Sequence, residues 1–225
     1  MTVTTDDAPS LGEGIYTFPQ AAQILSRRER PLTTRQVRYW THTGLVPASY
    51  EIEGHALLTF HDLISLEVVA RFLDAGWSLQ GVRRIEEELR AEYKDLVRPF
   101  AYRVFYTDGL SLWAGRHKDD PHVVELIGKK ARRNVKPLAW AGAVATFADE
   151  IRFEGANQGA SAWELSPWIE INPAIQFGAP VVRGTRVPIT TVIANLEKGT
   201  SGEVADWYDL TLDEVHGVRD YFAIN

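Results

Sequence analysis

The chain has 225 residues, of which 45% are hydrophobic and 24% charged, and its formal net charge is −6. This composition is ordinary for a soluble globular protein, and the length suffices for one large domain or two small ones. No apolar run reaches the roughly 20 residues that span a bilayer, so no membrane partner is expected. The absence of cysteine excludes disulfides, thiolate metal sites and cysteine nucleophiles, and a cytoplasmic protein is the default expectation.

The charge is unevenly distributed along the chain. Five arginines lie between Arg27 and Arg38 against one acid, Glu29, whereas four basic residues face eight acidic ones from residue 166 to the end. A basic patch near one end and an acidic region at the other indicate different partners for the two. The acidic stretch 1–14 lacks an apolar segment, so we expect a flexible tail rather than a signal peptide.

Two short helices are expected after this tail. Thr17 with Gln20, and Thr33 with Gln36, have the spacing of a capping box, in which a hydroxyl residue is followed three positions later by glutamine. Apolar residues recur at helical spacing after each box, and the second helix is expected to end at Thr43-Gly44. Two such helices joined by a connection form a helix-turn-helix candidate.

The exposed side of the second helix and the arginines before it are the candidate DNA contacts. Arginine binds phosphates and guanine, and a helix N-terminus attracts phosphate oxygens. The alternative is a solvated basic face without a ligand. Tyr39 and Trp40 could equally belong to the core, and Trp40 is the better core candidate because it continues the stripe of Val37. The candidate DNA contacts are Arg27, Arg28, Thr34, Arg35, Arg38, Tyr39 and His42.

The next segments predict a small β wing followed by a helix pair. Short, turn-bounded runs lie between Tyr50 and Phe60, and helical patterns follow over residues 63–73 and 78–89. In this order, YTFPQAAQIL, TTRQVRYWTHTGLVP, LTFHDLISLEVVARFLDAGWSL and VRRIEEEL resemble the DNA-binding domain of the MerR family, over about residues 16–90. The resemblance implies a winged helix-turn-helix with Arg35, Arg38 and Tyr39 on the recognition helix.

The chain departs from the MerR pattern at two places. The connection at residues 26–32 is longer than usual, and Ala56-Leu57-Leu58 stands where the family carries a wing arginine. We therefore expect a weaker or differently placed wing contact.

The middle of the chain is less informative. After Arg98-Pro99, residues 101–115 alternate around Asp108-Gly109, which predicts a hairpin. The segment GKKARRNVKP holds five basic residues, and it is either a solvated loop or a contact to phosphate or to an acidic protein. The histidines of HKDDPH, at 117–122, indicate a solvated stretch more than a metal site. Residues 157–161 are expected to be a flexible connector.

The last sixty residues predict a strand, a hairpin and three helices. Residues 168–173 alternate like a strand, and GAPVVRGTRVP at 178–188 predicts a tight hairpin, because Gly184 can take a positive φ between β-branched runs. Capping boxes at Thr200 and Thr211, with a glycine stop at Gly199, predict three short helices. The last helix is expected to expose three acids against one arginine, which would repel a phosphate backbone, so we expect a protein-contact module.

A second resemblance covers about residues 166–222. The segment WIEINPAIQFGAPVVRGTRVPITTVIANLEKGTSGEVADWYDLTLDEV resembles the C-terminal domain of VapB-type antitoxins. The resemblance implies an antitoxin that inhibits a PIN-like ribonuclease toxin of the VapC type, binds operator DNA to repress their shared operon, and forms a homodimer. Arginine would pair bidentately with the acidic site of such a toxin. The expected contacts to the toxin or the dimer partner are Arg183, Gly184, Arg186, Lys129, Lys130, Arg132 and Arg133.

The predicted fold is mainly α with small β elements (α+β). It comprises a flexible tail (1–14), a MerR-like domain (15–97), a middle region (98–165) and an antitoxin-type domain (166–225). The alternative function is a MerR-like regulator that senses a small molecule through the middle region, where Trp113 and Trp140 could line a pocket. An enzyme is the least favoured class, because no nucleophile elbow, P-loop or glycine fingerprint occurs. No catalytic residue, metal site or cofactor is predicted.

Overall fold

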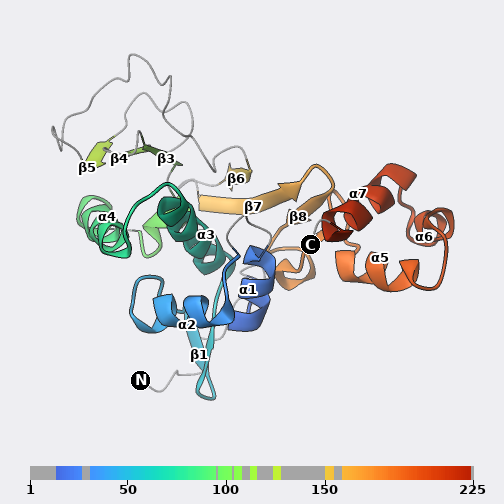
Figure 1. Ribbon diagram of the computed structural model, residues 1–225, viewed down its shortest axis with the longest axis horizontal. Coiled ribbons are helices and arrows are strands. Elements are labelled where there is room, and N and C mark those ends of the chain that lie inside the picture. The colour runs from blue at the N-terminus through green and yellow to red at the C-terminus, as the bar shows by residue number, and fades with distance from the viewer. Residues whose placement is uncertain are drawn as a thin grey trace, which may run out of the picture. The chain divides into compact units, whose positions relative to one another are not determined.

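The computed structural model describes residues 14–26, 31–94, 96–102, 104–107, 112–115, 124–127, 150–154 and 159–223. They form two compact units, one within Tyr16–Ala160 and one that joins residues 14 and 15 to the chain from Ser161 onward. Helices predominate and the sheets are small and antiparallel, so the predicted α+β class is confirmed (Figure 1). The domain boundaries expected from the sequence stay predictions.

The first two helices of the first unit begin at the predicted capping boxes. In α1 (Phe18–Leu25) and α2 (Thr34–His42), the N-cap threonine accepts a hydrogen bond from the glutamine amide, and the glutamine side chain accepts one from the N-cap amide. The buried face of α2 carries Val37 and Trp40 and packs on α1. Trp40 is therefore a core residue, as the periodicity predicted.

The wing is the hairpin of β1 (Tyr50–Ile52) and β2 (His55–Leu57). Its turn residues Glu53 and Gly54 have φ values of 51° and 77°, as a two-residue turn with positive φ at both positions requires. The chain continues into α3 (Phe60–Asp74), buried on almost every side, and α4 (Leu79–Glu92), which buries Val82, Ile85 and Leu89.

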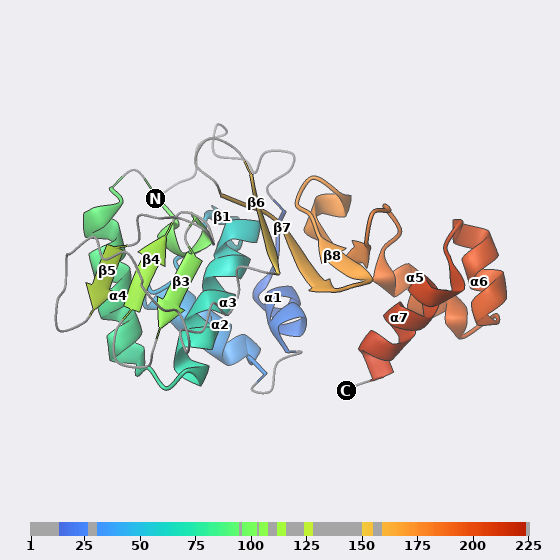
Figure 2. The same cartoon turned by 90° about the horizontal axis from the view of Figure 1, so that it is seen from above.

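A short 3-10 turn, η2 (Pro99–Tyr102), leads into the middle of the chain. There β3 (Val104–Thr107) and β4 (Leu112–Gly115) form the predicted hairpin, and β5 (Val124–Ile127) adds a third antiparallel strand beside β4. This sheet lies against α4, as Figure 2 shows from above. The sequence did not predict β5, because its four residues, VELI, are too few to show a clear hydrophobic period.

The second sheet has the order β6-β7-β8-β9. Its strands are β6 (Ile151–Glu154), β7 (Gly159–Ser166), β8 (Ile169–Ile171) and β9 (Val181–Val182). The prediction of a connector over residues 157–161 is wrong for residues 159–161, which begin β7. The strand opens with the small residues GASA, which have little strand propensity, so pairing with the neighbouring strands decides its conformation.

The three predicted C-terminal helices are α5 (Ile189–Leu196), α6 (Ser201–Tyr208) and α7 (Leu212–Ala223). Glu203 and Glu214 complete the capping boxes of Thr200 and Thr211. One core joins the helices to β8 and β9 and contains Ile169, Val182, Ile189, Val192, Val204, Ala205, Leu210, Val215 and Val218. Within the described residues, no helix is long and apolar enough to cross a membrane.

Candidate nucleic-acid interface

Helix α2 presents a polar, basic face opposite its buried one. Arg35, Arg38 and His42 are exposed, Thr34 is half-buried, and the ring of Tyr39 is 52% exposed. The period of 3.6 residues separates them from the buried positions of the same helix. The five described candidates for DNA contact thus lie on one helix, on the sides that the core leaves open, whereas Arg27 and Arg28 lie outside the described residues.

The cations of this face are available to a partner. Neither Arg35 nor Arg38 forms an ion pair with any residue that the structure describes, and the first turns of α1 and α2 contain no carboxylate. The partial positive charge of a helix N-terminus adds to that of nearby arginines. The arrangement therefore suits an anionic polymer such as nucleic acid.

Hydrogen bonds hold α2 against the rest of the unit. The guanidinium of Arg83 on α4 donates to the carbonyl and the hydroxyl of Thr43 at 3.1 and 2.7 Å, which fixes the end of α2. Backbone hydrogen bonds of 2.8 and 2.9 Å join Tyr16 to Leu58, so the segment before α1 is tied to the residue after the wing. Burial raises the pKa of the Tyr16 phenol, which keeps this core side chain uncharged.

A buried carboxylate anchors the base of the wing. Asp62 on α3 accepts hydrogen bonds from the amide and hydroxyl of Ser49 at 3.0 and 2.6 Å, and it pairs with the guanidinium of Arg98. Arg98 also donates to the carbonyl of Pro47 at 2.9 Å. The wing, α3 and the segment after α4 are therefore joined at one buried ion pair. The sequence did not predict this pair, because Asp62 and Arg98 lie 36 residues apart.

The wing itself carries little positive charge. Its exposed side chains include Glu51, Glu53 and His55, and Ala56 and Leu57 follow in β2. A phosphate backbone would meet two carboxylates there. The expectation of a weak or displaced wing contact remains a prediction.

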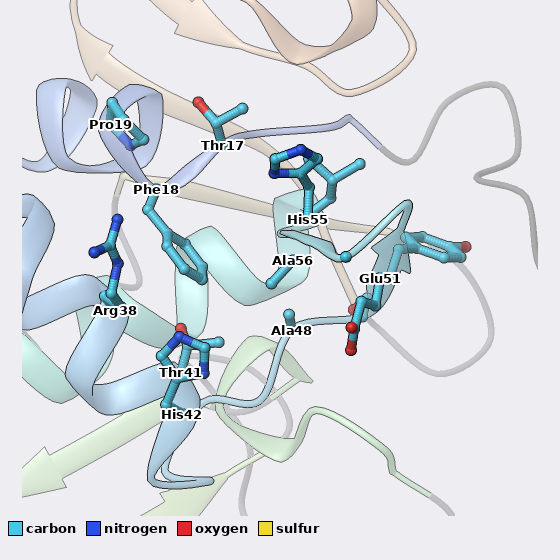
Figure 3. Close-up of a pocket in the computed structure, with 14 residues that line it drawn as sticks. Thr17, Phe18, Pro19, Arg38, Thr41, His42, Ala48, Glu51, His55 and Ala56 are labelled. Atoms are coloured by element: carbon cyan, nitrogen blue, oxygen red, sulfur yellow. The ribbon is translucent and has the colours of Figure 1, made fainter. Parts of the chain in front are cut away.

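A cleft of about 750 Å³ lies between α1, α2 and the wing (Figure 3). The side chains that face it come from all three elements, and the largest apolar group among them is the ring of Phe18. The lining residues are Thr17, Phe18, Pro19, Arg38, Thr41, His42, Ala48, Ser49, Tyr50, Glu51, Gly54, His55, Ala56 and Leu57. This cleft could not be predicted from the sequence, because its lining residues lie up to 40 positions apart.

The candidate contacts to a toxin or dimer partner differ in whether they already have a partner within the chain. Arg183 forms an ion pair of 2.8 Å with Glu164 on β7, whereas Arg186 is exposed and pairs with no described residue. Gly184 has a φ of 75°, and its amide donates to the buried carboxylate of Glu170, so the predicted hairpin turn is confirmed. Lys129, Lys130, Arg132 and Arg133 lie outside the described residues. Among those described, no cluster of side chains suited to a metal ion occurs.

Two family models match the chain. Residues 17–89 match the model described as MerR HTH family regulatory protein, and residues 169–222 match one described as a protein of unknown function, DUF433. The predicted MerR resemblance is therefore confirmed, and the N-terminal domain is a MerR-type helix-turn-helix domain. The description of the C-terminal family names no antitoxin.

The chain is also similar to curated proteins and to a solved structure. The uncharacterized HTH-type transcriptional regulators Rv1830 of Mycobacterium tuberculosis and Mb1861 of Mycobacterium bovis are each 30% identical over 133 residues, 57% of this chain. The chain spans about half the length of these curated relatives (54%). The crystal structure of Rv2018 from Mycobacterium tuberculosis has a TM-score of 0.62 at 18% identity, covering 90% of this chain and 96% of that one. The latter likeness concerns the fold alone.

Proposed function

We propose that this chain is a transcriptional regulator that binds operator DNA through α2 of its MerR-type domain. The observation that carries the proposal is the exposed face of α2, where Arg35 and Arg38 lack described ion-pair partners beside the exposed ring of Tyr39. The names of the relatives, which are HTH-type transcriptional regulators, support it. Regulation of transcription agrees with a cytoplasmic protein without enzymatic activity.

In the proposed complex α2 enters the major groove. Arginine there pairs with the acceptor edge of guanine or neutralises a phosphate, and both contacts favour a guanidinium that has no internal partner. A homodimer would present two copies of α2 to two half-sites one helical turn apart, about 34 Å. A palindromic operator upstream of the gene is the expected target.

Fluorescence anisotropy with DNA from upstream of the gene tests this proposal. We expect Arg35→Ala with Arg38→Ala to weaken binding by about a hundredfold and to reduce the dependence of log affinity on log salt by roughly two. Arg219→Ala, on the acidic α7, is the matched control and should leave both quantities unchanged. Equal affinities of the double variant and the wild type at about 0.15 M salt would remove α2 from this role.

For the C-terminal unit we propose contact with a protein rather than with DNA. Two features favour this. The ring of Phe177 is 68% exposed in a segment where Gln176, Phe177 and Gly178 all have positive φ, and the exposed guanidinium of Arg186 close by has no described ion-pair partner. Gln176 links the two by donating to the carbonyl of Arg186 at 3.0 Å. Exposed aromatics and arginines are the side chains that most often dominate protein interfaces.

The finer proposal is that this partner is a VapC-type, PIN-like toxin, which the chain would inhibit as an antitoxin. It rests on the resemblance of residues 166–222 and on the guanidinium of Arg186, which pairs with no described carboxylate and suits an acidic metal-dependent site. The basic cluster of residues 129–136 is a further candidate contact. The names of the relatives mention regulation of transcription and no toxin, so DNA binding is the broader proposal.

Co-expression with the product of the adjacent gene tests the antitoxin proposal. Growth should be restored by the wild-type chain and less by Arg186→Ala. Arg183→Ala serves as the matched control, because Arg183 already pairs with Glu164. An adjacent gene whose product neither stops growth nor co-purifies with the chain would leave DNA binding as its function.

A further inference from the structure

We propose that the cleft between α1, α2 and the wing binds a small organic anion, which competes with DNA for α2. The cleft lies within the MerR-type domain and not in the middle region, where the sequence analysis placed a possible sensor pocket. Three independent observations support the proposal: the size and chemistry of the cleft, an unpartnered hydroxyl in its wall, and the placement of its charges.

The cleft has the dimensions of an organic ligand. Its volume of about 750 Å³ lies within the range of about 300–1,000 Å³ that is typical of small-molecule sites and is far more than a single phosphate group would fill. The ring of Phe18 projects toward its centre and stands edge-on to the imidazole of His42, with ring centroids 5.9 Å apart. Pro19, Ala56 and Leu57 add apolar surface. An apolar body of ring size would pack there.

The wall of the cleft contains a buried hydroxyl without a partner. Thr41 is only 6% exposed, and its Oγ1 forms no hydrogen bond with any residue that the structure describes. Threonine within a helix can donate to the carbonyl four residues earlier, and an unsatisfied buried hydroxyl costs about 1–3 kcal/mol. This oxygen is closed off from solvent in the empty cleft, so a ligand reaches it once the Thr41 side chain rotates about χ1, and an acceptor atom of that ligand would then remove the cost. The orphan hydroxyl therefore points to an occupant that accepts a hydrogen bond.

The charges define the orientation of that occupant. Arg38 and Glu51 lie on opposite sides of the cleft in Figure 3, and the imidazoles of His42 and His55 also line it. Because Arg38 pairs with no described residue, an anionic group of the ligand would bind at its end, within the wall that Thr41 shares. Glu51 would repel a second negative charge at the other end. The site thus favours an aromatic or aliphatic monoanion over a dianion with separated charges.

Occupancy of the cleft would oppose DNA binding, a step that rests on the proposed function. Arg38 belongs both to the exposed face of α2 and to the wall of the cleft. A guanidinium that pairs with a ligand anion is withdrawn from phosphate or guanine. By linkage, DNA must weaken the ligand by the same factor by which the ligand weakens DNA.

Binding of anilinonaphthalene sulfonate, an aromatic monoanion that fluoresces in apolar sites, tests the proposal on the full-length chain without DNA. We expect one probe molecule per chain. Arg38→Met and Thr41→Val should each weaken the probe about tenfold, and Ala56→Trp, which fills the cleft, should abolish binding. Thr41→Val removes an unsatisfied group, so it should not lower the unfolding temperature. Arg35→Met, on the same helix but outside the cleft, is the matched control and should bind the probe normally.

The results separate this inference from the proposed function. Probe binding that is absent, or equal in all four variants, overturns the inference even if the chain binds DNA. Probe binding that follows the cleft variants supports the site even if no DNA binding is found, in which case the proposed function fails. Where both are observed, a saturating probe concentration should weaken DNA binding at least fivefold, and an unchanged DNA affinity would overturn the competition.

Discussion

Two helices of the N-terminal helix-turn-helix, α1 and α2, and two of the C-terminal group, α6 and α7, begin with the same capping motif but with different chemistry, whereas α5 begins at Pro188 without a side-chain cap. The boxes of α1 and α2 use the neutral amides of Gln20 and Gln36, whereas those of α6 and α7 use the carboxylates of Glu203 and Glu214. Both groups complete the same hydrogen bonds. The amide, however, leaves the helix start without a negative charge, as a surface that meets phosphate requires.

The exposed faces of the two groups also differ in charge. Helix α2 presents Arg35 and Arg38 without described ion partners, whereas α7 presents Asp213 and Asp220, and its Arg219 already lies 3.4 Å from Asp220. Both groups share a similar local shape of short capped helices. The difference teaches that charge at the exposed positions, rather than helix-turn-helix shape, indicates which region can meet DNA.

The largest expected effect concerns the ion pairs that hold each unit. Arg98→Met should lower the free energy of unfolding of the N-terminal domain by about 3–5 kcal/mol, because Asp62 would remain buried without its partner. Arg183→Met, in the exposed pair with Glu164, should cost at most about 1 kcal/mol. Hydrogen exchange of amides in α3 and α6 measures the two units separately. Equal losses in both variants would contradict the contrast between buried and exposed pairs.

A smaller effect is expected from exchanging the capping chemistry. Gln36→Glu should preserve the box at α2, and a carboxylate at a helix N-terminus is favourable, so the unfolding temperature should not fall. The new charge should nevertheless weaken DNA binding about tenfold by repelling phosphate. Gln23→Glu, later in α1, places the same charge outside a helix start and serves as the control. An unchanged DNA affinity of Gln36→Glu would show that neutrality of this cap is irrelevant to DNA.

The smallest effect is a pH dependence confined to the C-terminal unit. Hydrogen bonds from the amide and hydroxyl of Thr200 lower the pKa of Glu203. A lowered pKa in the folded state means that the stabilisation is complete above the ordinary glutamate pKa and is lost as the pH falls through the folded value. Glu203→Gln should therefore reduce the loss of urea resistance between pH 7 and about pH 3. The same acid sensitivity in wild type and variant would refute the assignment.

Helices were the elements that the sequence predicted best, because their signals are local. Each capping box lies within four residues of its own helix, and the boxes of Thr17, Thr33, Thr200 and Thr211 all form. The strands were harder to predict. β7 begins in a stretch expected to be a connector, because its conformation depends on its place between β6 and β8 in the sheet. The hairpin turn at Gly184 was nevertheless predicted correctly, because its signal is local: Gly184 takes the positive φ that the turn requires.

In the candidate site too, the sequence predicted what lies on one element and missed what several elements form together. The exposed face of α2 was predicted because the period of one helix places its members together. The cleft was not, because Thr17, Thr41 and His55 come from three elements that meet only in the folded domain. The ion pair of Asp62 and Arg98 was not predicted either. Nothing in the sequence distinguishes these two residues from other charged ones, because their pairing becomes important only through burial in the folded domain.

The sequence by itself determined where the helices begin, which of their faces are apolar, and how positive and negative charge divide between the two ends of the chain. These properties depend on residues a few positions apart. Only the tertiary structure decided which charges are used internally: Arg183 and Arg98 have carboxylate partners, whereas Arg35, Arg38 and Arg186 have none among the described residues. The physical reason is that an ion pair depends on distance and burial in space, and neither is written in the spacing of residues along the chain.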